Sequence, residues 1–254
     1  VAITGGAGTI GSAIAKEFSD NGAEIVLIDK DKEALLKASK KIGDNCLIIE
    51  CDLRNPINIE EAFKKIRSYF GGLDIMILNA GVAIPGTISN LDDDKLRESF
   101  EINFFSQQKV SQEALKIFQK QDSLNEKWIM GGQLLFNISK QALNPGKGFG
   151  AYGLSKAALL GLMKQYSLEE GENGIRSNGI NADRIKSGIL TQDMIKKRSE
   201  ARGLNETEYM EGNLLKSEVT AIDVAKAFLA ISQMEKTTGA LITVDGGNVA
   251  AMVR

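Results

Sequence analysis

Apolar residues along this chain follow two alternating patterns. Short runs of consecutive apolar residues, typical of buried strands, are followed by longer segments in which apolar residues recur every three or four positions, as on one helix face. The runs predict seven strands, at residues 1–4, 24–28, 47–51, 73–78, 133–138, 175–180 and 240–244. Because strands that alternate with helices form parallel sheets covered on both faces, we expect an α/β fold with a doubly wound parallel sheet.

The segments between these runs predict helices. They are expected over residues 55–70 and 92–119, and onward from residues 11, 152 and 220. Thr220 and Asp223 resemble a capping box at the start of the last helix. The polar stretch 121–127 should be a loop.

Residues 183–215 differ from the rest of the chain. They are highly charged, with helical character but little apolar periodicity. We interpret this segment as a lid over the substrate.

Length and charge limit the classes of protein to consider. The chain has 254 residues and no visible repeat, low-complexity tract or linker, so residues 1–254 should form one domain. Its net charge of −2 gives no reason to expect nucleic acid or an anionic membrane as partner. No run approaches the ~18 residues of a membrane-spanning helix, and no signal peptide is visible. Because Val1 already lies in a predicted strand, we expect the natural chain to begin earlier.

Cysteine and histidine usage narrows the chemistry. Cys46 and Cys51 lie in one strand-like run, residues 45–51, about 16 Å apart at ~3.3 Å per residue, which is beyond disulfide reach. Free thiols are typical of a reducing compartment, so we expect a cytoplasmic protein. The chain has no histidine, which excludes Ser-His-Asp and Cys-His catalysis and histidine metal sites. We expect no metal, and an acid or base must be Tyr, Lys, Asp, Glu or Cys.

A glycine-rich loop follows the first strand. Gly6, Gly8 and Gly11 match the G-x-G-x-x-G spacing and stand between a strand and a helix. Glycines allow a tight turn and let a pyrophosphate approach the helix N-terminus, where free N–H groups favour an anion. The loop therefore predicts a dinucleotide site in a Rossmann-type fold.

An acidic residue ends the second strand. Asp29 stands about 20 residues after the glycines, where a carboxylate accepts hydrogen bonds from the adenosine ribose and repels a 2′-phosphate. This favours NAD over NADP, although Lys30 follows directly. The alternative is a solvated aspartate at a strand end.

Polar residues at other strand ends and in one helix are candidates for the same site. Asn79, Ala80 and Gly81 form a sharp turn after the fourth strand, where ligands of open α/β sheets bind. Asn103 lies inside the predicted helix 92–119, where asparagine is unfavourable. It either points into the site or lies on a polar face.

Tyr152 and Lys156 are one helical turn apart on one helix face. A phenol titrates near pH ~10, and a nearby ammonium group favours the phenolate. Such a pair can move a proton to or from an alcohol. Taken alone, the spacing is common enough to arise by chance.

Together with Ser139, these motifs occur in the order typical of the short-chain dehydrogenase/reductase family, and the chain resembles that family over essentially its whole length. The resemblance implies an NAD-dependent enzyme acting on CH–OH groups of a small alcohol or carbonyl substrate. It also implies a homotetramer or dimer, with the helices at 92–119 and 152–168 pairing across subunits.

The resemblance assigns roles to single residues. Tyr152 corresponds to the acid/base, and Lys156 to the residue that lowers its pKa and holds the nicotinamide ribose. Ser139 corresponds to the serine that binds the substrate oxygen, and Asn103 to the asparagine that supports a proton-relay water. The resemblance also assigns the cofactor contacts. The phosphate loop would consist of Gly5, Gly8, Thr9, Ile10 and Gly11, and Asp29 would bind the ribose. Asp52 and Leu53 would contact the adenine, and the turn under the cofactor would be Asn79, Ala80 and Gly81.

Two departures from the family pattern stand out. Thr9 replaces a frequent glycine of the phosphate loop. Ala182 and Asp183 replace the usual Pro-Gly after the sixth strand, which leaves open how the nicotinamide carboxamide is held and what lies beside it.

The second departure narrows the resemblance. Residues 137–142, 181–185 and 209–215 look like the C-terminal dehydrogenase domain of bifunctional rhamnulose-1-phosphate aldolase/alcohol dehydrogenases, and similar sequences are labelled sorbitol-6-phosphate dehydrogenase. The substrate would be a small hydroxy-aldehyde such as lactaldehyde or a sugar-alcohol phosphate, which places the protein in carbohydrate metabolism. Six basic residues of the lid either contact a phosphate or form a solvated helix face: Arg184, Lys186, Lys196, Lys197, Arg198 and Arg202.

Two other functions share some of these motifs. Nucleotide-sugar epimerases and dehydratases carry the Tyr/Lys pair, but this chain lacks a sizeable C-terminal substrate domain. A non-catalytic dinucleotide-sensing protein would not need Ser139, Tyr152 and Lys156 together.

Overall fold

A seven-stranded parallel sheet forms the centre of the molecule. The computed structural model describes residues 1–43, 46–121 and 131–248. The strands are β1 (Ala2–Thr4), β2 (Ile25–Asp29), β3 (Cys46–Glu50), β4 (Ile75–Leu78), β5 (Gly132–Asn137), β6 (Ile175–Ala182) and β7 (Leu241–Val244). They lie in the order β3-β2-β1-β4-β5-β6-β7, and neighbouring strands are parallel. The predicted doubly wound α/β fold is confirmed.

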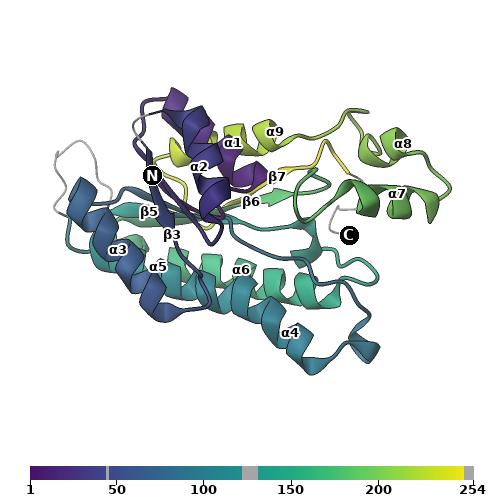
Figure 1. The fold of residues 1–254 in the computed structure, drawn as a ribbon, viewed down its shortest axis with the longest axis horizontal. Coiled ribbons are helices and arrows are strands. Elements are labelled where there is room, and N and C mark those ends of the chain that lie inside the picture. The colour runs from purple at the N-terminus through teal and green to yellow at the C-terminus, as the bar shows by residue number, and fades with distance from the viewer. Residues whose placement is uncertain (44–45, 122–130, 249–254) are drawn as a thin grey trace.

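Helices cover both faces of this sheet. The longer ones are α1 (Thr9–Asp20), α2 (Lys32–Ile42), α3 (Pro56–Phe70), α4 (Asp93–Phe100), α5 (Ser106–Phe118), α6 (Gly150–Glu169), α7 (Gln192–Glu200) and α9 (Ala221–Ser232). The shorter ones are η1 (Ile88–Asn90), η2 (Glu101–Phe105), η3 (Lys140–Ala142), η4 (Gly171–Asn173) and α8 (Glu206–Met210). Figure 1 shows α1, α2 and α9 on one side of the sheet and α3, α4, α5 and α6 on the other, with α7 and α8 at one end. Among the described residues, no helix is long and apolar enough to cross a membrane.

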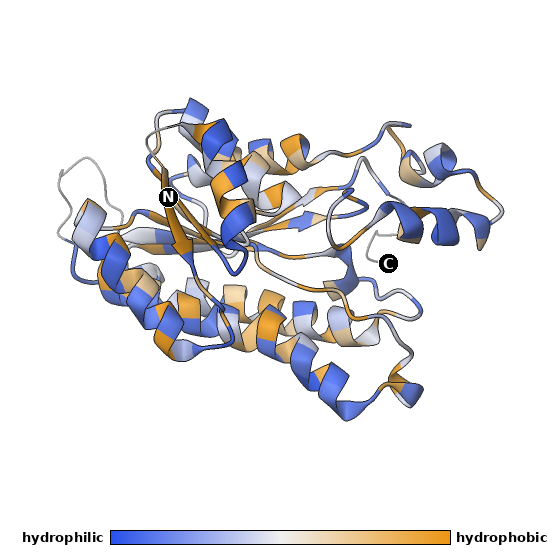
Figure 2. Ribbon diagram, in the orientation of Figure 1, coloured by the Kyte–Doolittle hydropathy of each residue, from blue (hydrophilic) through white to orange (hydrophobic). Residues whose placement is uncertain are grey.

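The core consists of two apolar clusters, one on each face of the sheet. Successive strand residues point to opposite faces, so that Val26 and Ile28 belong to one cluster and Ile25 and Leu27 to the other. All four are buried. Burial on both faces explains why strands read as unbroken apolar runs, whereas apolar positions on the helices concentrate on the side facing the sheet (Figure 2).

The long predicted helix 92–119 is helical but not uniform. It consists of α4, η2 and α5 in direct succession, and η2 is a π-helical turn that contains Asn103. Here the backbone amide of Ser106 donates to the carbonyl of Glu101, five residues earlier. Sequence periodicity did not reveal this turn, because a single π turn shifts the apolar pattern by only one position.

The predicted starts of α3 and α9 agree with the structure, whereas α1 and α6 begin two residues earlier than predicted. The Asn55 side chain caps α3 with Pro56 in its first turn, and Thr220 and Asp223 form a capping box at α9. Strand β3 begins one residue before its predicted start, and β6 extends two residues further, to Ala182. Apart from Gln121, the predicted loop 121–127 lies outside the described residues.

Residues 183–215 contain two helices that pack on each other. Leu190 and Ile195 form a small apolar cluster with Tyr209 and Met210, which joins α7 to α8. Because both helices are short, this cluster needs only a few apolar residues, and the sequence shows little periodicity. The pair adjoins the sheet at the carboxyl ends of its strands (Figure 1).

The strand order reverses between β1 and β4. From β1 the chain proceeds outward to β2 and β3, and then returns to the other side of β1 to form β4. Loops that leave β1 and β4 therefore diverge, and they open a crevice at the carboxyl ends of the strands.

Candidate active site

Amide and hydroxyl groups tie together the ends of three strands. Asn79 donates from Nδ2 to the carbonyl oxygens of Thr4 (3.0 Å) and Gly5 (3.2 Å), and accepts from Asn137 Nδ2 at 2.8 Å. The hydroxyl of Thr4 accepts from the backbone amides of Asn79 and Ala80. This network fixes the floor of the crevice. Thr4 and Asn137 were not predicted as site residues, and their only signal was a polar residue at the end of an apolar run.

A cleft of about 530 Å³ lies above this floor. All the residues predicted for the phosphate loop, ribose acid, adenine contact and Asn79-Ala80-Gly81 turn line it. Gly11 packs against the loop so closely that an added Cβ would lie 2.2 Å from the carbonyl oxygen of Gly5. No side chain caps the N-terminus of α1, and its first turn has no acidic residue. The free N–H groups of that turn and the helix dipole therefore fit a pyrophosphate.

Acidic and basic side chains also line the cleft. The carboxylate of Asp29 accepts hydrogen bonds from the backbone amides of Ala7 (3.2 Å) and Asp31 (3.3 Å), which hold it in place. Arg54 was not predicted as a site residue. It donates to both carboxylate oxygens of Asp52, from Nε and Nη2, and this ion pair lowers the pKa of Asp52. Lys30 also lines the cleft.

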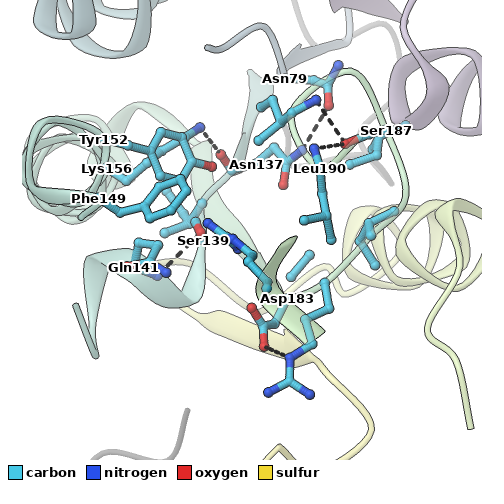
Figure 3. Close-up of a pocket in the computed structure, with 17 residues that line it drawn as sticks. Asn79, Asn137, Ser139, Gln141, Phe149, Tyr152, Lys156, Asp183, Ser187 and Leu190 are labelled. Atoms are coloured by element: carbon cyan, nitrogen blue, oxygen red, sulfur yellow. Dashed lines mark hydrogen bonds and ion pairs between the residues drawn. The ribbon is translucent and has the colours of Figure 1, made fainter. Parts of the chain in front are cut away.

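A smaller pocket of about 100 Å³ adjoins the cleft and contains Ser139, Tyr152 and Lys156. Ser139 follows β5, and the other two lie on one face of α6 (Figure 3). All three side chains are at least nine-tenths buried. Lys156 donates from Nζ to the backbone oxygen of Asn137 at 2.7 Å, and its Nζ lies 5.9 Å from the centre of the Tyr152 ring.

Burial controls the titration of this pair. Desolvation lowers the pKa of Lys156 to about 8. Desolvation also raises the pKa of Tyr152, while a hydrogen bond with Ser139 opposes the rise and the charge of Asp183 adds to it. The expected lowering of the phenol pKa is therefore wrong for this structure, because the loss of water outweighs the hydrogen bond with Ser139.

Asn103 lies behind the pocket and is completely buried, so its placement on a polar face is wrong. Its side chain accepts from the backbone amide of Val82 at 2.8 Å and donates to the Val82 carbonyl at 2.9 Å. It also donates to Ser155 Oγ on α6, at 3.0 Å. A Cβ on Gly81 would contact both Asn103 and Lys156. Asn103 thus joins the helix at η2 to the turn after β4 and to α6.

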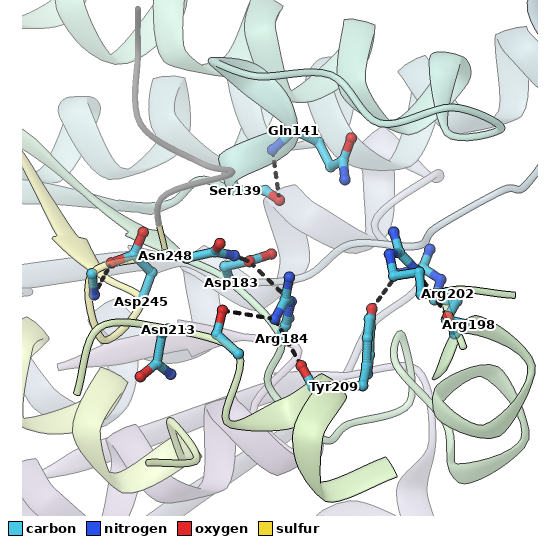
Figure 4. A network of polar contacts seen from close by, with 12 residues as sticks. Ser139, Gln141, Asp183, Arg184, Arg198, Arg202, Tyr209, Asn213, Asp245 and Asn248 are labelled. Carbon is cyan, nitrogen blue, oxygen red and sulfur yellow. Dashed lines mark hydrogen bonds and ion pairs between the residues drawn. The ribbon is translucent and has the colours of Figure 1, made fainter. Parts of the chain in front are cut away.

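The departure after β6 places an ion pair at the edge of the pocket. Asp183 lies 3.7 Å from Arg184 Nε and accepts from Asn248 Nδ2. Arg184 has a positive φ of 54° and donates from Nη1 to the carbonyls of Tyr209 and Gly212 (Figure 4). Arg184 therefore connects the end of β6 to α8 and the residues after it.

Of the six basic residues in the segment 183–215, only Arg184 and Arg198 line the pocket. Lys186 pairs with Glu218 at 3.4 Å, Lys196 and Lys197 are exposed, and Arg202 lies over the Tyr209 ring. The guanidinium of Arg198 lies 4.0 Å from the centre of the Phe149 ring. Phe149 was not predicted as a site residue, because nothing in its sequence context distinguishes it from a core aromatic.

The cleft and the pocket form one continuous site. They share five lining residues, Ile10, Asn79, Asn137, Ser187 and Ile189. Fold and site together define the class of Rossmann-type α/β proteins that have a Ser–Tyr–Lys pocket at the topological switch point.

Comparison with known proteins agrees with this class. The family model described as enoyl-(acyl carrier protein) reductase matches residues 5–248. Short-chain dehydrogenase reductase 3a of Arabidopsis thaliana is 31% identical, over 96% of this chain and 93% of its own length. The chain therefore belongs to the short-chain dehydrogenase/reductase family.

Two further similarities concern length and fold. Uncharacterized oxidoreductase YuxG of Bacillus subtilis is 32% identical over 99% of this chain, which spans only 37% of that longer protein. The structure of NAD+-bound xylitol dehydrogenase has a TM-score of 0.86 at 20% identity, and the match covers 97% of each chain. At that identity the likeness shows a shared fold.

Proposed function

We propose that this chain is an NAD(H)-dependent oxidoreductase that interconverts a small hydroxy-aldehyde, polyol or sugar alcohol with the corresponding carbonyl compound. The observation that carries the proposal is the pocket of Ser139, Tyr152 and Lys156, which opens directly into the glycine-lined cleft. A dinucleotide in the cleft would therefore meet a substrate in the pocket.

The cleft residues support NAD as the cofactor. The first turn of α1 would hold the pyrophosphate and Asp29 the adenosine ribose. Arg54, which in other surroundings would attract a 2′-phosphate, is already paired with Asp52. When bound, the nicotinamide accepts or gives the hydride.

The pocket residues would handle the proton. In alcohol oxidation the Tyr152 phenolate takes the hydroxyl proton while Ser139 donates a hydrogen bond to the substrate oxygen. Burial disfavours the phenolate. Its formation would therefore need the positive charges of Lys156 and of the bound nicotinamide ring. Asn103 would position Lys156 and, as the family resemblance implies, support a proton-relay water beside it.

The size of the pocket supports a small substrate. Its volume of about 100 Å³ is much less than that of the adjoining cleft. Lactaldehyde and a sugar-alcohol phosphate both remain candidates.

We also propose that the protein is a homotetramer or dimer in which α5 and α6 pair across subunits. Phe105, in the turn preceding α5, and Leu154, on α6, expose 52% and 49% of their surface.

Both cysteines are free thiols, as expected for a protein of the cytoplasm.

Replacement of Tyr152 by Phe tests the proposed chemistry. We expect NAD reduction with lactaldehyde, 1,2-propanediol, sorbitol or sorbitol 6-phosphate to fall by at least about 100-fold, because the proton acceptor is lost. NAD binding, measured by calorimetry, should change little.

Tyr69→Phe removes the same hydroxyl from an exposed tyrosine and is the matched control. Undiminished turnover in the Tyr152 variant would contradict the assigned role. Tight NAD binding without turnover of any compound by the unaltered protein would instead favour a dinucleotide-binding protein without catalysis.

A further inference from the structure

Arg198 connects the lid to the catalytic helix. It belongs to α7, and its guanidinium lies over the ring of Phe149, the residue that immediately precedes α6. Phe149 stands three positions before Tyr152. The charge of Arg198 is therefore held beside the pocket that contains the proposed acid/base.

Most of the hydrogen-bonding capacity of Arg198 is unused within the described residues. Its one observed contact of this kind is a long hydrogen bond of 3.4 Å from Nη1 to the Tyr209 hydroxyl (Figure 4). No carboxylate of the described chain lies within ion-pair distance, and a guanidinium carries five N–H donors. Arg184 differs, because its donors serve Asp183 and two backbone carbonyls.

Charged residues give the pocket an excess of positive charge. Its lining contains Lys156, Arg184 and Arg198 but only one acidic residue, Asp183. The charges of Asp183 and Arg184 compensate each other in an ion pair. Lys156 donates a hydrogen bond to the Asn137 carbonyl beside Tyr152. Arg198 is thus the cation of the described lining that remains available to a bound molecule.

The surroundings of Arg198 also fix its orientation. Stacking on Phe149 and the contact with Tyr209 restrict a side chain that otherwise loses much rotamer freedom on binding. A planar guanidinium held in this way is suited to two parallel hydrogen bonds with a carboxylate or phosphate.

We propose that Arg198 binds an anionic group of the substrate, a phosphate monoester or a carboxylate, and so selects charged over neutral alcohols. The inference rests on the proposed redox function of the same site. It assigns the anion to one residue and leaves the other basic lid residues without this role.

Two matched substrate pairs test the inference. Sorbitol 6-phosphate and sorbitol differ by a phosphate. Lactate has a carboxylate where 1,2-propanediol has a hydroxymethyl group. We expect the unaltered enzyme to favour the charged member of at least one pair in kcat/KM. Arg198→Gln should lower that value roughly 10- to 100-fold, mainly through KM, and leave the neutral member within about twofold. The pair that responds identifies the kind of anion.

Two control variants separate specific contact from general charge. Lys197→Gln removes the same charge from an exposed neighbour on α7 and should change neither pair. Arg198→Lys keeps the charge without the planar fork, and should restore only part of the preference.

Several outcomes would overturn the inference. Equal losses for charged and neutral substrates would make Arg198 a structural link between α7 and Phe149. A preference of the unaltered enzyme for neutral substrates would reject the anion site but leave the proposed oxidoreductase function intact. If no compound is turned over, the proposed redox function is rejected.

Calorimetric titration of the NAD-loaded protein with sorbitol 6-phosphate and with lactate then tests the anion site by itself. Binding that Arg198→Gln weakens would support the anion site, and unchanged or absent binding would reject it.

Discussion

Lys156 and Tyr152 are two titratable side chains almost completely removed from water. The pKa of Lys156 falls to about 8 in the folded protein, whereas a lysine in an unfolded chain titrates near ~10.4. Between these values the unfolded chain binds one more proton than the folded one at this residue. This difference makes the folded state more stable as the pH rises through the window, since a buried charge is no longer present.

Lys156→Met should expose this contribution, because methionine fills similar space without a proton to lose. From pH 8 to about 10 we expect the free energy of unfolding of the unaltered protein to rise relative to the variant, by on the order of 2 kcal/mol. Urea unfolding at pH 7, 8, 9 and 10 measures the difference.

Lys164→Met, on the exposed side of the same helix, is the matched control and should show no such trend. A constant difference between the unaltered protein and Lys156→Met across this pH range would mean that the Lys156 ammonium is not destabilised by burial.

Among the elements, the start of α1 has the tightest backbone contact of the site. Gly11→Ala would place a Cβ 2.2 Å from the Gly5 carbonyl oxygen, so the loop must move. We expect a loss of about 1–3 kcal/mol in the free energy of unfolding, together with weaker NAD binding, because the first-turn N–H groups shift with the loop. Urea unfolding and calorimetry measure the two effects.

Gly8→Ala serves as the comparison, since its Cβ would lie 3.3 Å from the same oxygen and its φ of −72° suits alanine. Its stability should change by less than about 1 kcal/mol. If the two variants unfolded alike, the contact at Gly11 would not determine the shape of the loop.

At the scale of the whole molecule, two of the exposed apolar residues lie on elements that we propose to join subunits. Phe105 in η2 and Leu154 in α6 are half exposed, and these two elements contact each other. If this surface joins subunits, Leu154→Glu should reduce the molecular mass in solution to that of one chain, because it places a charge in an apolar interface. Size-exclusion chromatography with light scattering measures the mass.

Leu36→Glu changes a similarly exposed leucine on α2 and should keep the oligomer intact. A Leu154 variant with the mass of the unaltered protein would exclude this surface as the main interface.

The fold and much of the site could be read from local patterns. Strands and helices could be predicted from apolar patterns because each buries a defined face. Burial on both sides of a parallel sheet leaves unbroken apolar runs such as residues 24–28. The glycine loop, Asp29 and the Asn79 turn were identifiable because they end predicted strands, and the carboxyl ends of parallel strands meet at one edge. The spacing of Tyr152 and Lys156 indicated a proton-transferring pair, and the family resemblance added Ser139 and gave all three their roles.

Other properties arise only when distant segments pack together. The pKa of Tyr152 depends on its burial and on Asp183, and the role of Asn103 depends on Val82 and Ser155, which no local pattern links to it. Arg198 was one of six similar basic residues until folding placed it over Phe149. Local sequence thus indicated most of the strands and helices and, to within one or two residues, where they begin and end. Three-dimensional packing decided how deeply each functional side chain is buried, which charges lie near it and which groups it contacts. These properties depend on residues from distant parts of the chain, which come together only on folding.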